Sequence, residues 1–291
     1  RHKALTYPRT DARALPEDYI PTVNEVVRGL PDQYAPFANE IVKQGWIKPN
    51  KRIFNNAKIS DHFAIIPTGK LPKSLSEAEQ KIYDLVTKRF LAVFYPAAEY
   101  QITTRITRIE SEAFKTEGKV LVNPGWLSVY GKEAASDDKD AKDGGSPQLV
   151  AVKQGETVST EDITLKSLQT KPPARYNEAT LLSAMEGAGK MVDDEELRAA
   201  MAERGLGTPA TRAQTIEGLI SEQYIHRDGR ELIPSAKAFS LITLLKGLGV
   251  TALTSPELTG GWEYKLSRME RGELSREAFM QEIGDMAREV V

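Results

Sequence analysis

The sequence predicts an α+β protein of more than one domain, in which helical regions flank a central β-rich region. Apolar residues recur at helical spacing before residue 94, apolar and polar residues alternate over 99–110, and helix signals return after Pro172. A chain of 291 residues is long enough for two or three modest domains, each with its own core. The boundaries we expect give domains at 1–94, 95–170 and 171–291.

The first region is predicted to be helical. Ser76 and Glu79 have the spacing of a capping box, in which each side chain satisfies a backbone N–H of the other residue. Two shorter helices are expected before it, around residues 23–27 and 37–41, with prolines between them. A helix is expected after the capping box, because an apolar stripe recurs there at helical spacing. The stripe consists of Ile82, Leu85, Val86, Phe90 and Val93.

The β-rich region begins after Pro96. Residues 99–110 alternate apolar and polar side chains and contain many β-branched types, which predicts a half-buried strand of an antiparallel sheet. Residues 113–121 and 148–152 show a similar pattern. Residues 132–147 are dense in Asp, Lys, Gly and Ser, which is typical of a solvated loop.

Helix start signals return in the third region. Asn177 is a predicted N-cap, and Asp193 or Asp194 is another. Thr208 followed by Pro209 predicts a further helix start, because Pro fits the first turn and the Thr hydroxyl can bond a free N–H.

A β-hairpin is expected next, with Asp228 and Gly229 as its turn. Helix, turn, helix and a small hairpin is the order of elements in a winged-helix DNA-binding module. A last helix is predicted to start near Ser275. Its expected buried residues are Phe279, Ile283, Met286 and Val290.

The amino-acid composition excludes several kinds of site and segment. The chain has no cysteine, which excludes disulfides and cysteine-ligated zinc, and its three histidines are too scattered to suggest a metal site. No apolar run reaches the roughly 18 residues of a membrane span. The formal net charge of -2 argues mildly against a nucleic-acid binder, which is usually basic. A local basic groove can nevertheless exist on a chain whose net charge is negative.

The first candidate for chemistry is Tyr7. A tyrosine hydroxyl is a weak nucleophile near neutral pH because its reference pKa is about 10, so it needs a nearby cation or base. Arg9 could supply the charge, and Pro8 restrains the backbone between the two residues. On these residues alone, a half-buried surface tyrosine is the commoner interpretation.

Two further candidates come from local context. His62 stands between Asp61 and an apolar run, a placement that could fix its tautomer and hold it over a phosphate. A capping or core histidine is the simpler interpretation of His62 by itself. Arg175 and Tyr176 put a positive charge beside a stacking surface, which suits a single strand of nucleic acid, although a plain domain hinge fits equally well.

Six sequence blocks together resemble the type IA DNA topoisomerases. Thr-Tyr-Pro-Arg-Thr-Asp at 6–11 and Asp-His-Phe-Ala-Ile-Ile-Pro-Thr at 61–68 are similar to the family's active-site region, in the form of its topoisomerase III branch. One departure is Phe63, which stands where that branch often has a second histidine and which we expect to pack. The other blocks, in the family's order, are Gly118–Trp126, Lys171–Leu182, Gly205–Arg212 and Leu253–Gly260.

The resemblance implies an ATP-independent enzyme that cleaves one DNA strand, passes another through the break and religates it. Tyr7 would form a 5′-phosphotyrosine link, Arg9 would contact the scissile phosphate, and His62 would hydrogen-bond near it. Cationic groups there would stabilise the charge that builds on the phosphate oxygens. The helix expected at Thr208 would present free N–H groups to a strand phosphate. The implied DNA-binding residues are Arg175, Tyr176, Thr208, Thr211 and Arg212.

The family's fold is a torus, of which this chain would be part: a helical domain with the tyrosine, a β-rich arch and a helical base. The chain begins just before Tyr7, so we expect the Toprim domain, which holds acidic residues and Mg²⁺ in the family, to lie outside it. We therefore expect no metal site here, Mg²⁺ in the full-length enzyme, and no relaxation by this fragment alone. The expected partner is single-stranded or negatively supercoiled DNA. The expected setting is a monomer in the bacterial cytoplasm, at the nucleoid and away from membranes.

Two other classes of function remain open. The chain could be a non-catalytic winged-helix module that binds single-stranded DNA, with Tyr7 as a structural residue, and the slightly acidic composition favours this for the fragment. It could also be a scaffold whose acidic loop and arch bind a partner protein, although nothing specific indicates that. A covalent protein–DNA adduct is expected of the enzyme only.

Overall fold

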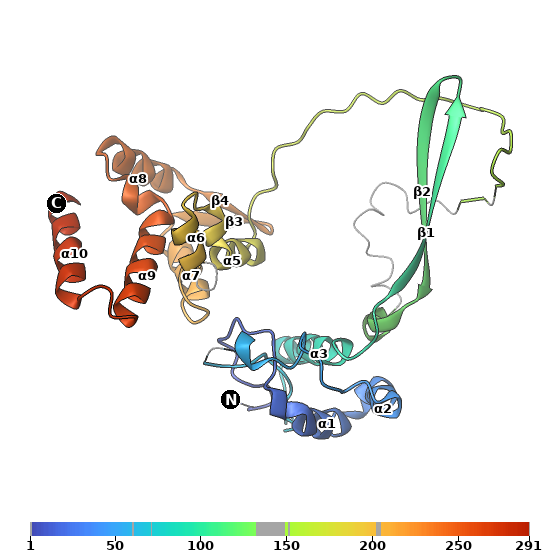
Figure 1. Cartoon of the computed structure of the whole chain (residues 1–291), viewed down its shortest axis with the longest axis horizontal. Helices are drawn as coiled ribbons and strands as arrows, with labels where there is room; N and C mark the ends of the chain where they lie inside the picture. The colour runs from blue at the N-terminus through green and yellow to red at the C-terminus, as the bar shows by residue number, and fades with distance from the viewer. Residues whose placement is uncertain are drawn as a thin grey trace. The chain divides into compact units, whose positions relative to one another are not determined.

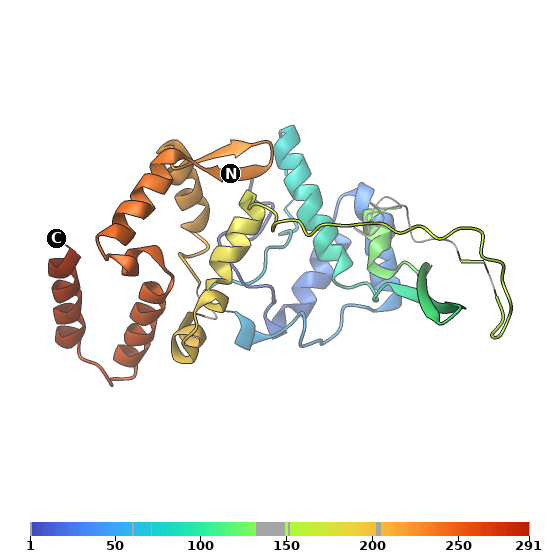
Figure 2. The same ribbon diagram turned by 90° about the horizontal axis from the view of Figure 1, so that it is seen from above.

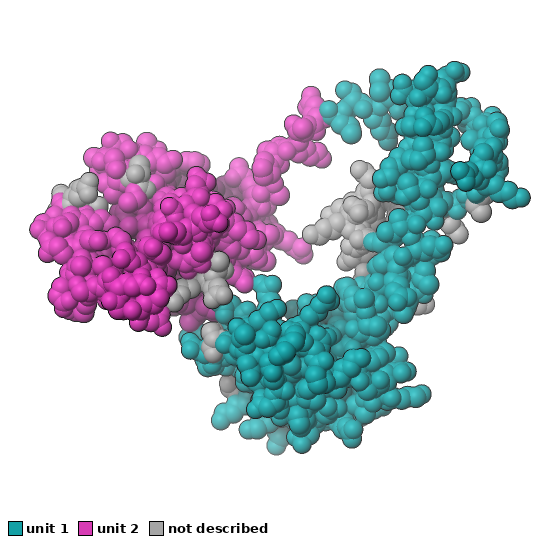
Figure 3. Space-filling view, viewed as in Figure 1, with its two compact units in different colours: residues 1–168 teal, residues 169–291 magenta. Residues whose placement is uncertain are grey.

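The computed structural model describes residues 2–59, 61–70, 72–131, 149–150, 152–201 and 205–290. The chain forms two compact units, residues 1–168 and 169–291, which Figure 3 shows in teal and magenta. The predicted acidic loop at 132–147 lies outside the described residues. The domain boundaries expected at residues 94 and 170 stay predictions.

Three α-helices build the N-terminal part of the first unit: α1 (Ile20–Arg28), α2 (Ala35–Gln44) and α3 (Glu77–Ala92) (Figure 1). Pro21 and Pro36 lie in the first turns of α1 and α2, where a missing N–H costs nothing. Gly45 ends α2 in the left-handed conformation, with φ of 63°. The two short helices predicted before α3 are therefore confirmed.

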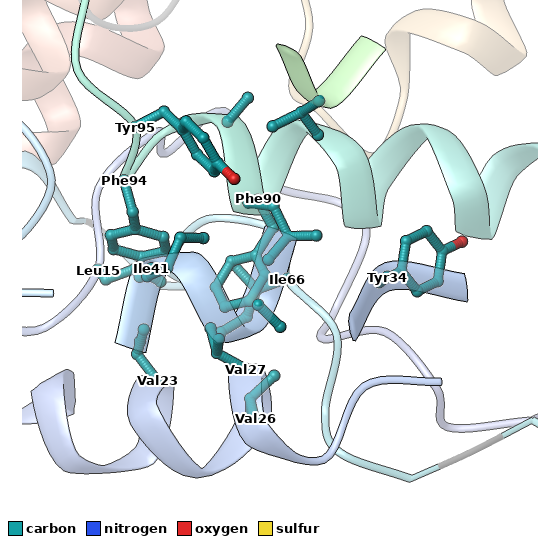
Figure 4. Packing of buried hydrophobic residues seen from close by; sticks show 14 of the residues in the cluster. Leu15, Val23, Val26, Val27, Tyr34, Ile41, Ile66, Phe90, Phe94 and Tyr95 are labelled. Atoms are coloured by element: carbon teal, nitrogen blue, oxygen red, sulfur yellow. The ribbon is translucent and has the colours of Figure 1, made fainter. Parts of the chain in front are cut away.

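These helices close over one hydrophobic core (Figure 4). Val23 and Val27 of α1 and Ile41 of α2 have no exposed surface. Ile66, from a segment without regular structure, packs in the same cluster. Because Ile66 follows His62 by four residues, the core holds the segment that carries this histidine. The other members labelled in Figure 4 are Leu15, Val26, Tyr34, Phe90, Phe94 and Tyr95.

The capping box predicted at the start of α3 is confirmed. The Glu79 N–H donates to Ser76 Oγ over 3.3 Å, and the Ser76 N–H donates to the Glu79 carboxylate over 2.8 Å. The His2 ring lies 3.3 Å from the same carboxylate. The box therefore also connects α3 to the N-terminal segment that leads to Tyr7.

The helix predicted from the apolar spacing is confirmed as α3, but most of that apolar stripe is not buried. Ile82 and Leu85 are 57% and 63% exposed, Val93 is exposed as well, and Val86 is half-buried. Of the five predicted residues only Phe90 is buried. Aromatic packing sets the buried face, because Tyr83 meets Tyr34 edge to face and turns the helix away from the predicted stripe. The buried α3 residues are Tyr83, Thr87, Phe90, Leu91 and Ala92.

A long antiparallel hairpin follows α3. Its strands β1 (Glu99–Ile109) and β2 (Glu112–Asn123) confirm the first two predicted strands. The predicted half-burial is wrong, because Gly118 is the only residue buried within these two strands. A two-stranded ribbon leaves both faces open, so the alternation of side chains buries neither set. The strand predicted at 148–152 is absent where the chain is described, since residues 149, 150 and 152 lie in no strand.

The connection from the hairpin to the second unit is extended. Residues 152–176 contain no helix or strand, and Figures 1 and 2 both show this stretch as a thin yellow-green line. Its apolar side chains are exposed, with Leu165 at 97% and Leu168 at 86%. The stretch therefore adds no hydrophobic core of its own.

A close backbone contact anchors the base of the hairpin. The Trp126 N–H donates to the Pro96 carbonyl over 3.0 Å, which joins the chain entering β1 to the chain leaving β2. Gly125 sits against this contact with φ of 47°. A Cβ at this position would lie 2.5 Å from the carbonyl oxygens of both Pro96 and Ala97. The contact requires glycine because the backbone has a positive φ and because there is no room for a Cβ.

The second unit combines helices with a short hairpin. Asn177 Oδ1 accepts the Thr180 N–H at 2.8 Å, and Asp194 Oδ1 accepts the Leu197 N–H at 2.9 Å, so the two predicted N-caps are confirmed. The elements are α5 (Glu178–Glu186), α6 (Glu195–Met201), α7 (Arg212–Ser221), β3 (Ile225–Asp228), β4 (Glu231–Pro234), α8 (Ala236–Gly247), α9 (Glu257–Glu270) and α10 (Arg276–Val290).

The predicted hairpin is confirmed with its turn displaced by one residue. Asp228 pairs with Glu231, so Gly229 and Arg230 form the turn. The last helix is also confirmed, since Ser275 Oγ accepts the Ala278 N–H at 3.2 Å. Its predicted burial is not: α10 is the outermost helix of its unit (Figure 1), and three of the predicted residues are only half-buried. These are Phe279, Ile283 and Met286, while the side chain of Val290 lies outside the description.

A small core holds the second unit together. Ala188, Val192 and Met201 are buried, with Leu197 packed against them. Gly260 brings α9 close to α6, because a Cβ there would stand 3.0 Å from the Met201 sulfur. In the described part of the chain, no helix is both long and apolar enough to cross a membrane.

Replacing Gly125 is expected to loosen the base of the hairpin. Gly125→Ala should lower the free energy of unfolding by about 1–3 kcal/mol, because alanine meets both the left-handed backbone and the two carbonyl oxygens. Gly45→Ala is the matched control, since Gly45 also has positive φ but nothing lies within 4 Å of its added Cβ. Urea denaturation followed by circular dichroism measures both variants. Equal losses in the two variants would contradict a steric role for the Pro96–Gly125 contact.

The capping box predicts a dependence of stability on pH. The hydrogen bonds from the Ser76 N–H and hydroxyl to the carboxylate lower the pKa of Glu79 from 4.5 to about 2. A pKa that is lower in the folded state gives stability that is complete above pH 4.5 and disappears as pH falls through 2. The urea midpoint of wild type should therefore exceed that of Glu79→Ala at pH 7, with a difference that shrinks below pH 4.5. Glu77→Ala, on the same turn, should show a smaller and flatter difference.

Candidate active site and DNA-contact residues

The segment that carries Tyr7 is paired with the segment that carries His62. Leu5 forms an antiparallel bridge with Pro67, and the Thr6 N–H donates to the Ile66 carbonyl over 2.9 Å. The Thr68 N–H donates to the Ala4 carbonyl over 3.0 Å. This pairing brings together two motifs that lie more than fifty residues apart in the sequence.

The rings of Tyr7 and His62 are in direct contact. Their centroids lie 4.2 Å apart with 33° between the planes. Tyr7 is 49% exposed and His62 is exposed too, so a ligand can reach both rings from solvent. The exposure of His62 excludes a core histidine, whereas the half-exposed Tyr7 fits a surface tyrosine as well as a functional one.

Arg9 lies on the same loop and points its charge into solvent. It is exposed, and it makes no hydrogen bond or ion pair with any residue that the structure describes. An unpaired guanidinium beside an open phenol can take a phosphate oxygen in a bidentate contact. Tyr7, Arg9 and His62 therefore place a phenol, a cation and an imidazole on two paired and exposed loops.

Phe63 packs, as its place beside His62 predicted. Its ring centroid lies 4.9 Å from that of Tyr19, and the side chain contacts the edge of the hydrophobic core. The alternation of the chain therefore sends Phe63 inward and leaves His62 outward.

The loop before α7 differs from the expected helix start. The helix begins at Arg212, not at Thr208, and no side-chain hydrogen bond caps it. Thr208 instead closes a turn: its carbonyl accepts the N–H groups of Thr211 and Arg212 at 2.9 and 3.0 Å. Its own N–H donates to Thr211 Oγ1 over 2.9 Å. The free N–H groups expected at Thr208 are thus partly used by this turn.

Arg212, which was expected to face a strand phosphate, is buried. Its side chain is 6% exposed, and its Nε donates to the Leu206 carbonyl over 3.0 Å. Gly205, with φ of 66°, fixes the same loop, because a Cβ there would lie 2.3 Å from the Met185 carbonyl. The Arg212 guanidinium group therefore bonds the backbone of this loop.

Arg175 and Tyr176 precede α5 in an extended segment. Tyr176 is 49% exposed, and its carbonyl accepts the Leu232 N–H of β4 at 2.7 Å. The segment is therefore attached to the hairpin of the second unit, which leaves the Tyr176 ring available for stacking. Arg227 of β3 adds a second attachment through Glu178 of α5 and Glu217 of α7.

Comparison with known proteins decides the family. A family model described as DNA topoisomerase matches residues 1–281. The chain belongs to the type IA DNA topoisomerases. It is 41% identical over its whole length to DNA topoisomerase 3 of Bacillus subtilis and 40% identical to DNA topoisomerase 3 of Bacillus cereus. It spans 40% of the length of each of these relatives.

The fold also agrees with a solved topoisomerase. Full-length topoisomerase I from Thermotoga maritima superposes with a TM-score of 0.67 over 99% of this chain and 42% of that one, at 22% identity. At this identity the likeness concerns the fold. It supports the predicted α+β class of a partial type IA topoisomerase.

Mg²⁺, which the topoisomerase family implies, has no ligand set in the described part of this chain. No three His, Asp or Glu side chains come close enough there to hold a metal ion. Asp11 and Asp61 flank the Tyr7 and His62 loops, but two carboxylates alone make a poor site for a cation that favours six oxygen ligands.

Two residues that fix the loop carrying Tyr7 were not predicted from the sequence. Thr6 and Thr10 bracket the Tyr-Pro-Arg segment, and both hydroxyls bond to the His62 segment. The available signal was the repeated threonine on either side of Tyr7, since Thr hydroxyls commonly bond backbone groups in irregular segments. Which backbone they would reach was not readable from the sequence.

The burial of Arg212 predicts that its side chain stabilises the second unit in the absence of DNA. Arg212→Ala should destabilise the second unit by about 2–3 kcal/mol, because it opens space beside Leu206 and leaves a carbonyl without its charged donor. Arg230→Ala, at the exposed hairpin turn, should change stability by less than about 0.5 kcal/mol. Chemical denaturation of the two variants measures this. Equal stabilities would show that Arg212 does not hold the loop.

Proposed function

We propose that this chain carries the nucleophile of an ATP-independent type IA DNA topoisomerase. Tyr7 Oη attacks a phosphorus atom of single-stranded DNA, a P–O bond forms to the tyrosine, and the bond to the 3′-oxygen breaks. The phenolic proton is lost and the 3′-oxygen gains one, so atoms and charge balance. The 5′-phosphotyrosine link keeps the energy of the phosphodiester, and religation by the reverse step needs no ATP.

The observation that carries this proposal is the exposed Tyr7–His62 pair with Arg9 on the same loop. An imidazole can donate a hydrogen bond to a phosphate oxygen or exchange a proton near neutral pH. A guanidinium stabilises the negative charge that develops on the phosphate during attack. The identity of 41% over the whole chain supports the same assignment.

The proposed substrate is single-stranded or negatively supercoiled DNA. In the second unit, Arg175 and Tyr176 supply a charge and a stacking ring, and the turn at Thr208 and Thr211 supplies hydroxyls beside the start of α7. Arg212 contributes by holding this turn, as its burial indicates. The alternative, a non-catalytic winged-helix module for single-stranded DNA, uses the same residues and predicts no covalent adduct.

The parent enzyme is expected to need more than this chain, which spans 40% of its relatives. We expect acidic residues of a Toprim domain to hold Mg²⁺ and to complete the site in the parent. We also expect the parent to act as a monomer in the cytoplasm, at the nucleoid, in relaxation or decatenation. The 291-residue chain alone is expected to bind single strands weakly and to leave supercoiled DNA unrelaxed.

Adduct formation tests the proposal. The chain, restored to the length of its relatives, is incubated with a 3′-labelled single-stranded oligonucleotide and Mg²⁺ and then denatured. Wild type and Tyr100→Phe, a hairpin tyrosine remote in sequence from the site, should retain label on the protein, and Tyr7→Phe should lose it. Label on Tyr7→Phe would assign the nucleophile elsewhere. DNA binding without label on any form would favour the binding module.

A further inference from the structure

The contact between the Tyr7 and His62 rings depends on the pairing of the two segments that carry them. Both rings are exposed, and neither the Tyr7 hydroxyl nor the His62 ring makes a hydrogen bond with the residues that the structure describes. The register between the two segments decides which side chains lie opposite each other, and it places the two ring centroids 4.2 Å apart. A slip of one residue in extended chain is roughly 3.3 Å, which is enough to separate the rings.

Thr6 fixes this register on the N-terminal side of Tyr7. Its hydroxyl donates to the Ala64 carbonyl over 3.1 Å and accepts the Ile66 N–H at 2.9 Å. Its own N–H donates to the Ile66 carbonyl over 2.9 Å. Thr6 thus bonds the partner segment at two residues, and two of its three bonds depend on the hydroxyl.

Thr10 fixes the register on the C-terminal side. Its hydroxyl donates to the carbonyl of His62 itself over 3.0 Å and accepts the Ala12 N–H at 3.1 Å. The Ala64 N–H then donates to the Ala14 carbonyl over 2.9 Å. The loop that contains Tyr7 and Arg9 is therefore bonded to the His62 segment at both of its ends.

We propose that Thr6 and Thr10 are positioning residues, whose hydroxyls lock the Tyr7 loop onto the His62 segment and so set the contact between the two rings. The proposal deepens the proposed function and rests on it for its catalytic consequence. The claim that the two threonines set the ring contact concerns only this chain, and the NMR experiment below tests it separately. Neither residue touches DNA in this role, since both hydroxyls are occupied by backbone groups.

The first test observes the ring contact in the 291-residue chain by NMR. Thr6→Val and Thr10→Val keep the shape of the side chain and remove the hydroxyl, and Thr6→Ser and Thr10→Ser restore it. Thr68→Val is the matched control, because Thr68 Oγ1 bonds the Lys3 carbonyl in the same pairing but farther from the rings. The chain has three histidines, so His62→Gln assigns the ring signal of His62.

Both valine variants should lose the cross-peak between the Tyr7 and His62 ring protons, and the His62 signal should move toward that of a free histidine. The serine variants and Thr68→Val should keep both features. Retention of the cross-peak in both valine variants, with a stability loss like that of Thr68→Val, would overturn the proposal. If Thr6→Val does not fold, Thr10→Val decides, since Thr10 lies on a half-buried loop outside the core cluster.

The second test measures catalysis in the chain restored to the length of its relatives. At saturating DNA, the rate of adduct formation should fall roughly 10- to 100-fold in each valine variant, because misplacement by about 1 Å has an effect of that size. The DNA dissociation constant should stay unchanged, and serine should rescue the rate. An unchanged rate in both valine variants would overturn the catalytic part. Absence of adduct in wild type would instead refute the proposed function, while the NMR test still judges the positioning.

Discussion

The candidate site depends on the pairing between residues 4–6 and residues 64–68. Backbone hydrogen bonds and the Thr6 hydroxyl join these segments, and the intervening chain contains α1 and α2. Ala4 and Ile66, one on each segment, are buried in the helical core. The pairing is thereby anchored to packed side chains, so a rigid core supports an open site.

Neighbouring residues of the His62 segment differ in how far they are buried. Ile66 and Phe63 pack inward, while His62 stays exposed beside Tyr7. This division fits the proposed DNA substrate, since a strand could then reach the phenol and the imidazole without local unfolding. The type IA topoisomerase assignment therefore agrees with the local geometry as well as with the comparison over the whole chain.

Two arginines of the second unit bond to other parts of the same unit and so stabilise its fold. Arg212 supports the Gly-Leu-Gly turn from within, and Arg227 joins α5, α7 and β3 through Glu178 and Glu217. Hydrogen bonds to these two carboxylates raise the pKa of Arg227. The charge of Arg227 is therefore paired within the unit. The groups that we propose for DNA contact in this unit are exposed ones, above all the Tyr176 ring.

The sequence by itself determined the local signals and the family. The capping box at Ser76, the caps at Asn177 and Asp194, the two strands of the long hairpin and the motif at Tyr7 were all readable, because each depends on residues close together in the chain. Only the tertiary structure decided which faces are buried. The stripe through Ile82 and Leu85 faces solvent because aromatic side chains set the buried face of α3, and Arg212 turns inward because the loop at Leu206 needs a donor. The contact between Tyr7 and His62, and the threonines that hold it, likewise arise from a pairing across more than fifty residues, which no local pattern specifies.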